Sequence, residues 1–238
     1  MADAIGETEY AGTLRDRHQK AKEEWNQFFV DPESGRTKNL EGLIVHSQSS
    51  YATPLNFNVF SEKNKLKAEA YLAELVKEPS NSNTKPDGTR VTYPMREGAL
   101  GGFGMNSEQV TEDFLPYTIT TGFSGTPNIL PSLSRGGKVD EAYKLFSSTD
   151  YTSWLYPVTK GATSIWERWN GFKAAFKENN ENRMNSFNHF ALGAVGQWMY
   201  EFQLGITTDH QKGEAGYKHF VLQPQVAGTF ESLSGSYQ

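Results

Sequence analysis

Hydrophobic residues recur every three or four positions in several stretches of the chain, with polar residues between them. The first stretch covers residues 8–29, where Thr8 is the expected N-cap and the turn at residues 31–35 ends the helix. This spacing places the recurring side chains on one face of an amphipathic helix. The recurring side chains are Tyr10, Leu14, His18, Ala21, Trp25 and Phe28.

More helices are predicted from the same periodicity and from residues that cap or stop a helix. One helix begins near Ser47 and is perturbed at Pro54, and the next has Ser61 as its cap and is stopped by Pro79. A third includes residues 129–133, a fourth covers Val139–Phe146, and a fifth covers about Ser186–Leu204. In the last of them, Gly193 and Gly196 would let a neighbouring element approach closely.

Two stretches lose this periodicity and are predicted to be loops. Residues 79–113 are rich in Ser, Asn, Gly, Pro and Thr, and residues 173–183 are charged and rich in Asn. Near the end of the chain, residues 217–224 and 228–237 alternate between apolar and polar positions, a pattern that predicts two β-strands.

About seven helices in consecutive pairs, with long loops between them, suit a toroid of paired helices. Seven is a poor number for a closed ring, so we expect a partial ring that leaves apolar helix faces open. Such faces would cause poor solubility or association. The candidate faces carry Tyr10, Leu14 and Trp25, or Phe190, Val195 and Trp198.

The composition narrows the function classes. Hydrophobic residues make up 37% of the 238 residues, but aromatic residues reach 13%, which suits a sugar-stacking surface or a core short of aliphatic side chains. The net charge of −5 and the lack of a basic cluster argue against nucleic-acid binding. The absence of cysteine excludes disulfides and thiolate metal sites. No signal peptide or membrane-spanning run is visible, and the compartment stays open.

Glu167 is the candidate for chemistry that the sequence offers first. It lies between Trp166 and Arg168, with Trp169 next, in a run that glycines bracket at residues 161 and 171. Indole rings can shield a carboxylate partly from water and ready it for proton transfer. The alternative is structural: the tryptophans anchor the core and Glu167 pairs with Arg168 or solvent.

Four motifs resemble the C-terminal half of the catalytic domain of bacterial-type α-L-rhamnosidases, which are inverting glycoside hydrolases with an (α/α)6 barrel. They stand in the order that this family has, and the similarity around them covers most of the chain and is weakest over residues 79–113. The motifs are TTGFSGTP at 120–127, SWLYPVTKGATSIWERWNG at 153–171, MNSFNHFALGAVG at 184–196 and GYKHFVLQP at 216–224.

The resemblance implies roles for five residues. Glu167 matches the general base of the family, and His189 matches a histidine that contacts the rhamnose. Trp154, Trp166 and Trp169 fall in segments that line the substrate pocket. A structural role remains open for each of these side chains: His189 could be satisfied within a helix interface, and tryptophans more often support a core than stack on a ligand.

The resemblance also implies the architecture: a mainly α fold in which residues 1–210 form part of an (α/α)6 barrel and residues 211–238 begin a C-terminal β-sandwich. The general acid of the family belongs to an Asp-rich motif that residues 1–60 do not contain. Inverting hydrolysis needs two carboxyl groups about 6.5–9.5 Å apart. We therefore expect little or no activity from this chain alone.

Three functions stay open at this stage. The chain is part of an enzyme that hydrolyses terminal α-L-rhamnosyl groups, a non-catalytic carbohydrate-binding protein on a degenerate half-barrel, or part of another (α/α)6 glycosidase. We expect no cofactor or metal, and no nucleic-acid or membrane partner. The expected partners are a rhamnose-containing glycoside and a complementing N-terminal half or a second copy of the chain.

Overall fold

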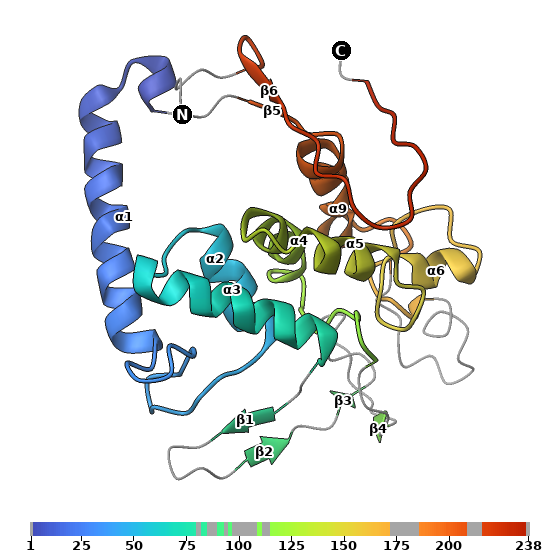
Figure 1. The fold of residues 1–238 in the computed structure, drawn as a ribbon, viewed down its shortest axis with the longest axis horizontal. Coiled ribbons are helices and arrows are strands. Elements are labelled where there is room, and N and C mark those ends of the chain that lie inside the picture. Colours follow the sequence, from blue (N-terminus) through green and yellow to red (C-terminus); the bar gives the residue numbers. More distant parts are fainter. Residues whose placement is uncertain are drawn as a thin grey trace.

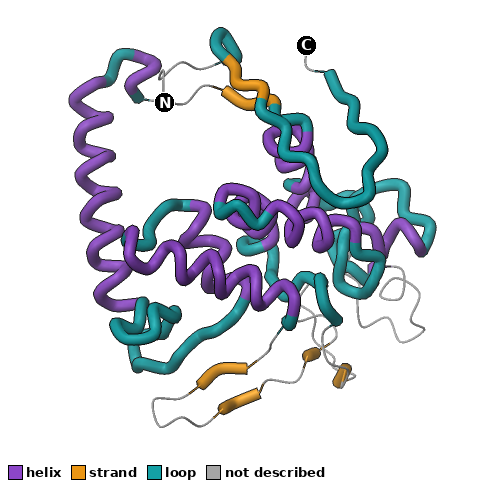
Figure 2. Tube along the Cα trace, in the orientation of Figure 1, coloured by secondary structure: helices purple, strands orange, loops and turns teal. Residues whose placement is uncertain are grey.

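The computed structural model describes residues 2–79, 82–84, 90–92, 95–96, 109–110, 115–171, 186–208 and 216–236 of the chain. Helices dominate this part of the chain, and strands are short (Figure 2). The prediction of a mainly α fold is confirmed. The loop predicted at residues 173–183 and most of that predicted at 79–113 lie outside the described residues.

The helices are η1 (Asp3–Ile5), α1 (Thr8–Phe29), α2 (Gln48–Asn56), α3 (Glu62–Lys77), α4 (Thr126–Arg135), α5 (Val139–Ser147), α6 (Leu155–Thr159), α8 (Phe190–Gly193), α9 (Val195–Trp198) and the π-helix η2 (Met199–Gln203). The strands are β1 (Ser82–Thr84), β2 (Arg90–Thr92), β3 (Met95–Arg96), β4 (Gln109–Val110), β5 (Ile206–Thr208) and β6 (Phe220–Leu222), and they pair antiparallel as β1–β2, β3–β4 and β5–β6.

Helix α1 lies at one edge of the molecule and meets the rest mainly through its C-terminal half (Figure 1). There, the Asn26 side chain donates to the carbonyl of Val59 at 2.8 Å and accepts from the N–H of Ser61 at 3.0 Å. Trp25 packs edge-on against the buried ring of Phe60. The prediction that Thr8 caps this helix is wrong, because the cap position is one residue earlier and Thr8 is already helical.

Helix α2 forms the centre of the core, because it packs against both α3 and α4. Its start agrees with the sequence: the Ser47 and Ser50 side chains each accept from the other's backbone N–H, which is a capping box. Tyr51 and Ala52 on this helix are completely buried. Pro54 lies inside the helix, which continues to Asn56.

Gln48, in the first turn of α2, joins three segments through one buried side chain. Its amide nitrogen donates to the carbonyls of Leu75, at 3.1 Å, and Thr118, at 2.8 Å. Its amide oxygen accepts from the backbone N–H of Thr120 at 2.8 Å. Buried backbone polar groups need such partners, so this one residue fixes the end of α3 and the segment that precedes α4.

Buried hydroxyl groups supply many of the other contacts between elements. Ser132 on α4 donates to the carbonyl of Ala52 on α2 at 2.8 Å, and Ser134 accepts from the indole N–H of Trp198 at 2.8 Å. Thr152 donates to the carbonyl of Ile119 at 2.5 Å. Hydrogen bonds that need matching positions on both sides thus hold these elements together alongside the apolar contacts of the core.

The helix predicted over residues 186–204 begins later and is interrupted. Residues 186–189 precede α8, a turn at Ala194 separates α8 from α9, and the last turn is the π-helix η2. The apolar periodicity does not reveal the late start, because the backbone at Ser186 and His189 hydrogen-bonds to residues 165–167 instead.

The C-terminal strands are only partly as predicted. Residues 220–222 form β6, whose partner β5 was not foreseen. The strand predicted over residues 228–237 is wrong: the described residues 228–236 are turn and coil. In that segment Phe230 packs on Tyr143 and Phe146 of α5. The boundary between domains at residues 210 and 211 stays a prediction.

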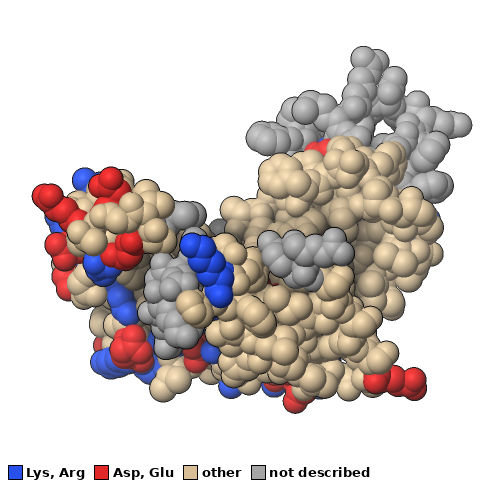
Figure 3. Space-filling view, turned by 90° about the horizontal axis from the view of Figure 1, so that it is seen from above, with Lys and Arg blue, Asp and Glu red and all other residues tan. Residues whose placement is uncertain are grey.

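Both of the apolar faces that a partial ring would leave open are exposed in part. On α1, Tyr10 is 54% exposed and Leu14 41%, and at the start of α8 Phe190 is 88% exposed. Trp198, by contrast, is buried. Figure 3 shows charged side chains crowded on the α1 side of the molecule, whereas the rest of that face is mostly uncharged. An apolar patch larger than is normal for a monomer stays a prediction.

Replacement of Gln48 should destabilise the fold strongly. In Gln48→Leu the carbonyls of Leu75 and Thr118 and the N–H of Thr120 lose their partner, and each such buried group costs about 1–3 kcal/mol. We expect a loss of more than about 2 kcal/mol in urea denaturation. The control is Gln19→Leu on the exposed side of α1, which should change stability by less than about 0.5 kcal/mol. Equal losses in both variants would contradict the prediction.

Candidate functional site

The candidate site is built on two segments that pair with each other between the helices. The N–H of Glu167 donates to the carbonyl of Ser186 at 2.8 Å, and the N–H of His189 donates to the carbonyl of Ile165 at 2.8 Å. The Ser164 hydroxyl also bonds the carbonyl of Phe187. These antiparallel contacts bring two motifs together that are about twenty residues apart in the sequence.

The side chain of Glu167 is partly buried and is held by the same pairing. Its Oε2 accepts the backbone N–H of Ser186 at 2.7 Å. Glu167 therefore contacts Ser186 twice, through its backbone and through its carboxylate. One oxygen is anchored in this way, and among the described residues Oε1 has no hydrogen-bond partner, so this oxygen is available to a ligand or to water.

His189 stands at the end of the second segment, where it caps α8. Its ring stacks on Phe123, at a centroid distance of 4.8 Å, and on Phe190, at 5.3 Å. Its Nδ1 accepts the backbone N–H of Ala191 at 3.3 Å. The ring is thus held by two aromatic contacts and one hydrogen bond.

The three tryptophans predicted to line the pocket are all buried. Trp154 and Trp169 belong to the main hydrophobic core, where their rings meet edge to face at 6.0 Å, and the Trp154 indole donates to the carbonyl of Leu192. Trp166 packs edge-on against Phe187 at 5.4 Å. These contacts favour a supporting role for the indoles, and their contact with a sugar stays a prediction.

Two residues at this site were not singled out from the sequence. Ser186 orients the carboxylate of Glu167, and Phe123 covers one face of His189. Both lie inside the motifs that carry the family resemblance, at residues 184–196 and 120–127. Their roles depend on which segments pair in three dimensions, so no signal in the sequence marks them beyond membership of a motif.

The described residues contain no group of three or more His, Cys, Asp or Glu side chains that could hold a metal ion. Within the same part of the chain, no helix is both long and apolar enough to cross a bilayer. What the paired segments can offer chemically is a carboxylate on one segment and an imidazole on the other. A carboxylate can accept a proton, and an imidazole can donate a hydrogen bond.

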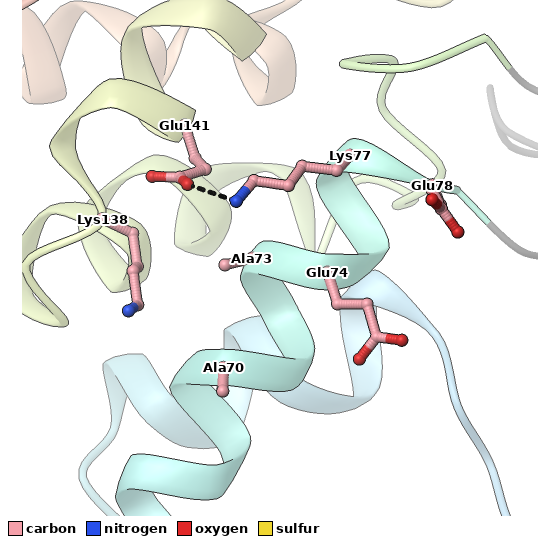
Figure 4. Close-up of a pocket in the computed structure, with 7 residues that line it drawn as sticks. All are labelled: Ala70, Ala73, Glu74, Lys77, Glu78, Lys138 and Glu141. Atoms are coloured by element: carbon pink, nitrogen blue, oxygen red, sulfur yellow. Dashed lines mark ion pairs between the residues drawn. The ribbon is translucent and has the colours of Figure 1, made fainter.

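A surface pocket of about 390 Å³ lies elsewhere, between α3 and α5 (Figure 4). Ala70 and Ala73 contribute apolar surface, and the charged groups around them are Glu74, Lys77, Glu78, Lys138 and Glu141. None of the site residues predicted from the sequence lines it. Opposite charges neutralise one another across this pocket, which suits a contact between two helices better than a substrate site.

The ion pair of Lys77 and Glu141 spans this pocket at 2.8 Å. Burial alone would raise the pKa of Glu141, but the hydrogen bond and the charge of Lys77 outweigh burial and leave that pKa below its ordinary value. The same hydrogen bond raises the pKa of Lys77. Both shifts favour the charged pair, which joins the end of α3 to the start of α5.

Comparison with known proteins places the fold and the motifs in one class. A family model described as the bacterial alpha-L-rhamnosidase 6 hairpin glycosidase domain matches residues 109–202. An alpha-L-rhamnosidase of Formosa agariphila is 32% identical over 236 residues, which are 99% of this chain and 20% of that protein. Another, of Streptomyces avermitilis, is 42% identical over 128 residues, which are 50% of this chain and 12% of that protein.

Two solved structures agree with this class. The structure of Streptomyces avermitilis alpha-L-rhamnosidase complexed with L-rhamnose has a TM-score of 0.59 and 28% identity, and the match covers 86% of this chain and 15% of that one. The Aspergillus terreus enzyme has a TM-score of 0.61 and covers 87% of this chain and 19% of that one; at 24% identity it supports the fold alone.

The resemblance inferred from the four motifs is confirmed: this chain is similar to part of the six-hairpin glycosidase domain of bacterial α-L-rhamnosidases. The chain spans 20% of the length of one of these relatives and 12% of another. The similarity therefore covers only a part of these relatives.

Loss of the Lys77–Glu141 pair should destabilise the fold only above acid pH. Because the pKa of Glu141 is lowered in the folded chain, its stabilising contribution is present above the ordinary carboxyl pKa and disappears as the pH falls through the folded value. Glu141→Gln should lower the unfolding free energy by about 0.5–1 kcal/mol at pH 7.

The difference between Glu141→Gln and the unmodified chain should vanish near pH 3, as measured by urea denaturation at both pH values. Glu41 is an exposed carboxylate that forms no ion pair with the described residues, so Glu41→Gln is the matched control and should show no such pH dependence. A loss in Glu141→Gln that is the same at both pH values would contradict the assignment.

Proposed function

We propose that this chain supplies the general-base side of an inverting α-L-rhamnosidase. The observation that supports this most is the pairing of the two motifs, which brings the segments that carry Glu167 and His189 together and anchors one carboxylate oxygen on Ser186. An anchored carboxylate with a second oxygen available suits the activation of a water molecule. The names of the relatives and the rhamnose complex of one of them support the choice of sugar.

In this proposal Glu167 accepts a proton from a water molecule while the water attacks the anomeric carbon. The attack comes from the face opposite the leaving group, which inverts the configuration at that carbon. A carboxylic acid on the other side protonates the leaving oxygen. That acid lies in a motif that residues 1–60 do not contain, so it would come from a preceding segment or from a separate chain.

The rest of the barrel would also have to come from outside these residues. The exposed Tyr10 and Leu14 of α1 and the exposed Phe190 of α8 are the surfaces that such a part would cover. We propose residues 1–210 as the barrel portion and residues 211–238 as the start of the β-sandwich. Self-association through the same faces is the alternative, and it would appear as a dimer in sedimentation.

A non-catalytic carbohydrate-binding role is the second candidate. It is favoured by the burial of all three predicted tryptophans, which leaves Glu167 and His189 as the predicted site residues with polar groups to offer. Both roles predict binding of the same sugar, but only the catalytic role predicts release of a hydrolysis product. Another (α/α)6 glycosidase would instead release the aryl group of a non-rhamnosyl glycoside.

Hydrolysis of an aryl α-L-rhamnoside would test the catalytic role. The chain alone should be nearly inactive, and the chain assembled with an upstream segment that carries the acid motif should be active. In that assembly Glu167→Gln should lower the rate roughly 10²- to 10⁴-fold, the range for general base catalysis.

The matched control for this experiment is Glu231→Gln, a change at an exposed position of the C-terminal coil, which should leave the rate unchanged. Unchanged hydrolysis in Glu167→Gln would remove the base assignment. Absence of hydrolysis in the assembled protein, with retained binding of L-rhamnose, would favour the carbohydrate-binding role instead.

A further inference from the structure

The hydrogen bond at the start of α8 determines where the proton of His189 lies. The Ala191 N–H is a backbone group and can only donate, so His189 Nδ1 must accept with its lone pair. A neutral imidazole carries one proton, and if Nδ1 is the acceptor the proton is on Nε2. A proton on Nδ1 would place two donors against each other and would remove the cap of α8.

Two phenylalanine rings restrict the imidazole of His189. Phe123 lies nearly parallel to it, with an interplanar angle of 21°, and Phe190 lies at 11°. With Nδ1 engaged, the remaining polar position of the ring is Nε2. Among the described residues Nε2 has no hydrogen-bond partner, and the residue is partly exposed.

We propose that the cap of α8 and the two phenylalanine rings hold His189 as the Nε2–H tautomer, which makes it a fixed hydrogen-bond donor to a sugar oxygen and not a proton acceptor. The identity of the ligand rests on the function proposed above, whereas the tautomer rests on the geometry alone.

This arrangement separates the tasks of the two side chains at the site. A neutral N–H suits a hydroxyl or ring oxygen of a neutral sugar. With the His189 lone pair occupied by the Ala191 N–H, the proton acceptor of the pair is Glu167. An imidazole free to exchange tautomers could accept a proton or donate one, and the cap removes the first possibility.

Long-range ¹H–¹⁵N spectra of the histidine rings would test the tautomer directly in the full chain without sugar. At pH 8, His189 should show an unprotonated Nδ1 and a protonated Nε2. A protonated Nδ1, or a mixture of the two tautomers, would overturn the proposal. Assignment uses His189→Asn, whose spectrum lacks only the His189 signals.

Two substitutions distinguish the role of His189 as the cap of α8 from its role as a hydrogen-bond donor to the sugar. In His189→Asn the side-chain oxygen can still accept the Ala191 N–H, because Asn is a strong N-cap, but it lacks a group in the place of Nε2. In His189→Gln the longer amide can place an N–H near the Nε2 position but cannot cap the helix as well. The two variants should therefore fail in opposite ways.

We expect His189→Asn to keep the thermal midpoint and to weaken binding of L-rhamnose roughly five- to tenfold, the effect of one lost hydrogen bond. His189→Gln should lower the midpoint by about 2–4 °C and keep most of the affinity. Binding is followed by titration with L-rhamnose, with D-glucose as the control sugar. If both variants lost affinity equally, or if only the Asn variant lost stability, the proposal would be overturned.

The tautomer and the sugar contact can fail separately. If the spectra give the Nε2–H tautomer but L-rhamnose does not move the Nε2 signal, the donor role is removed, and with it the support that His189 gives to the proposed function. If L-rhamnose binds but the tautomer is wrong, the proposed function stands and the fixed-donor proposal is overturned.

Discussion

The buried amide of Gln48 is the contact on which the geometry of the site depends. It joins α2 to the end of α3 and to the backbone at Thr118 and Thr120. That backbone leads within three residues to Phe123, whose ring covers one face of His189. A position in the core is thereby connected to a position in the site through a short, hydrogen-bonded segment.

The pairing of residues 165–167 with residues 186–189 adds a second constraint. It takes the backbone around Glu167 and His189 out of the helices and sets it at their ends, where functional groups on a rigid scaffold are commonly found. The helices carry the apolar contacts, and the paired segments present the polar groups. The buried indoles of Trp154 and Trp169 lie behind these segments and support them.

The sequence was a good guide where a helix buries one face against the core. The bounds of α1, α3 and α5 agree with the apolar periodicity, and the capping box at Ser47 marks the start of α2. It was a poor guide at the start of α8, because hydrogen bonds to a distant segment set this start.

The strand predicted over residues 228–237 failed because alternation alone provides no partner strand, and Phe230 packs on α5 instead. The side-chain chemistry of the site could be predicted from the motifs, but the positions of Ser186 and Phe123 could not.

The serine and threonine hydroxyls inside the core also affect how the stability of the chain responds to temperature. Exposing polar surface on unfolding lowers the heat-capacity change, whereas exposing apolar surface raises it. A core that exchanges methyl groups for hydroxyls therefore gives a flatter stability curve, with weaker destabilisation on cooling.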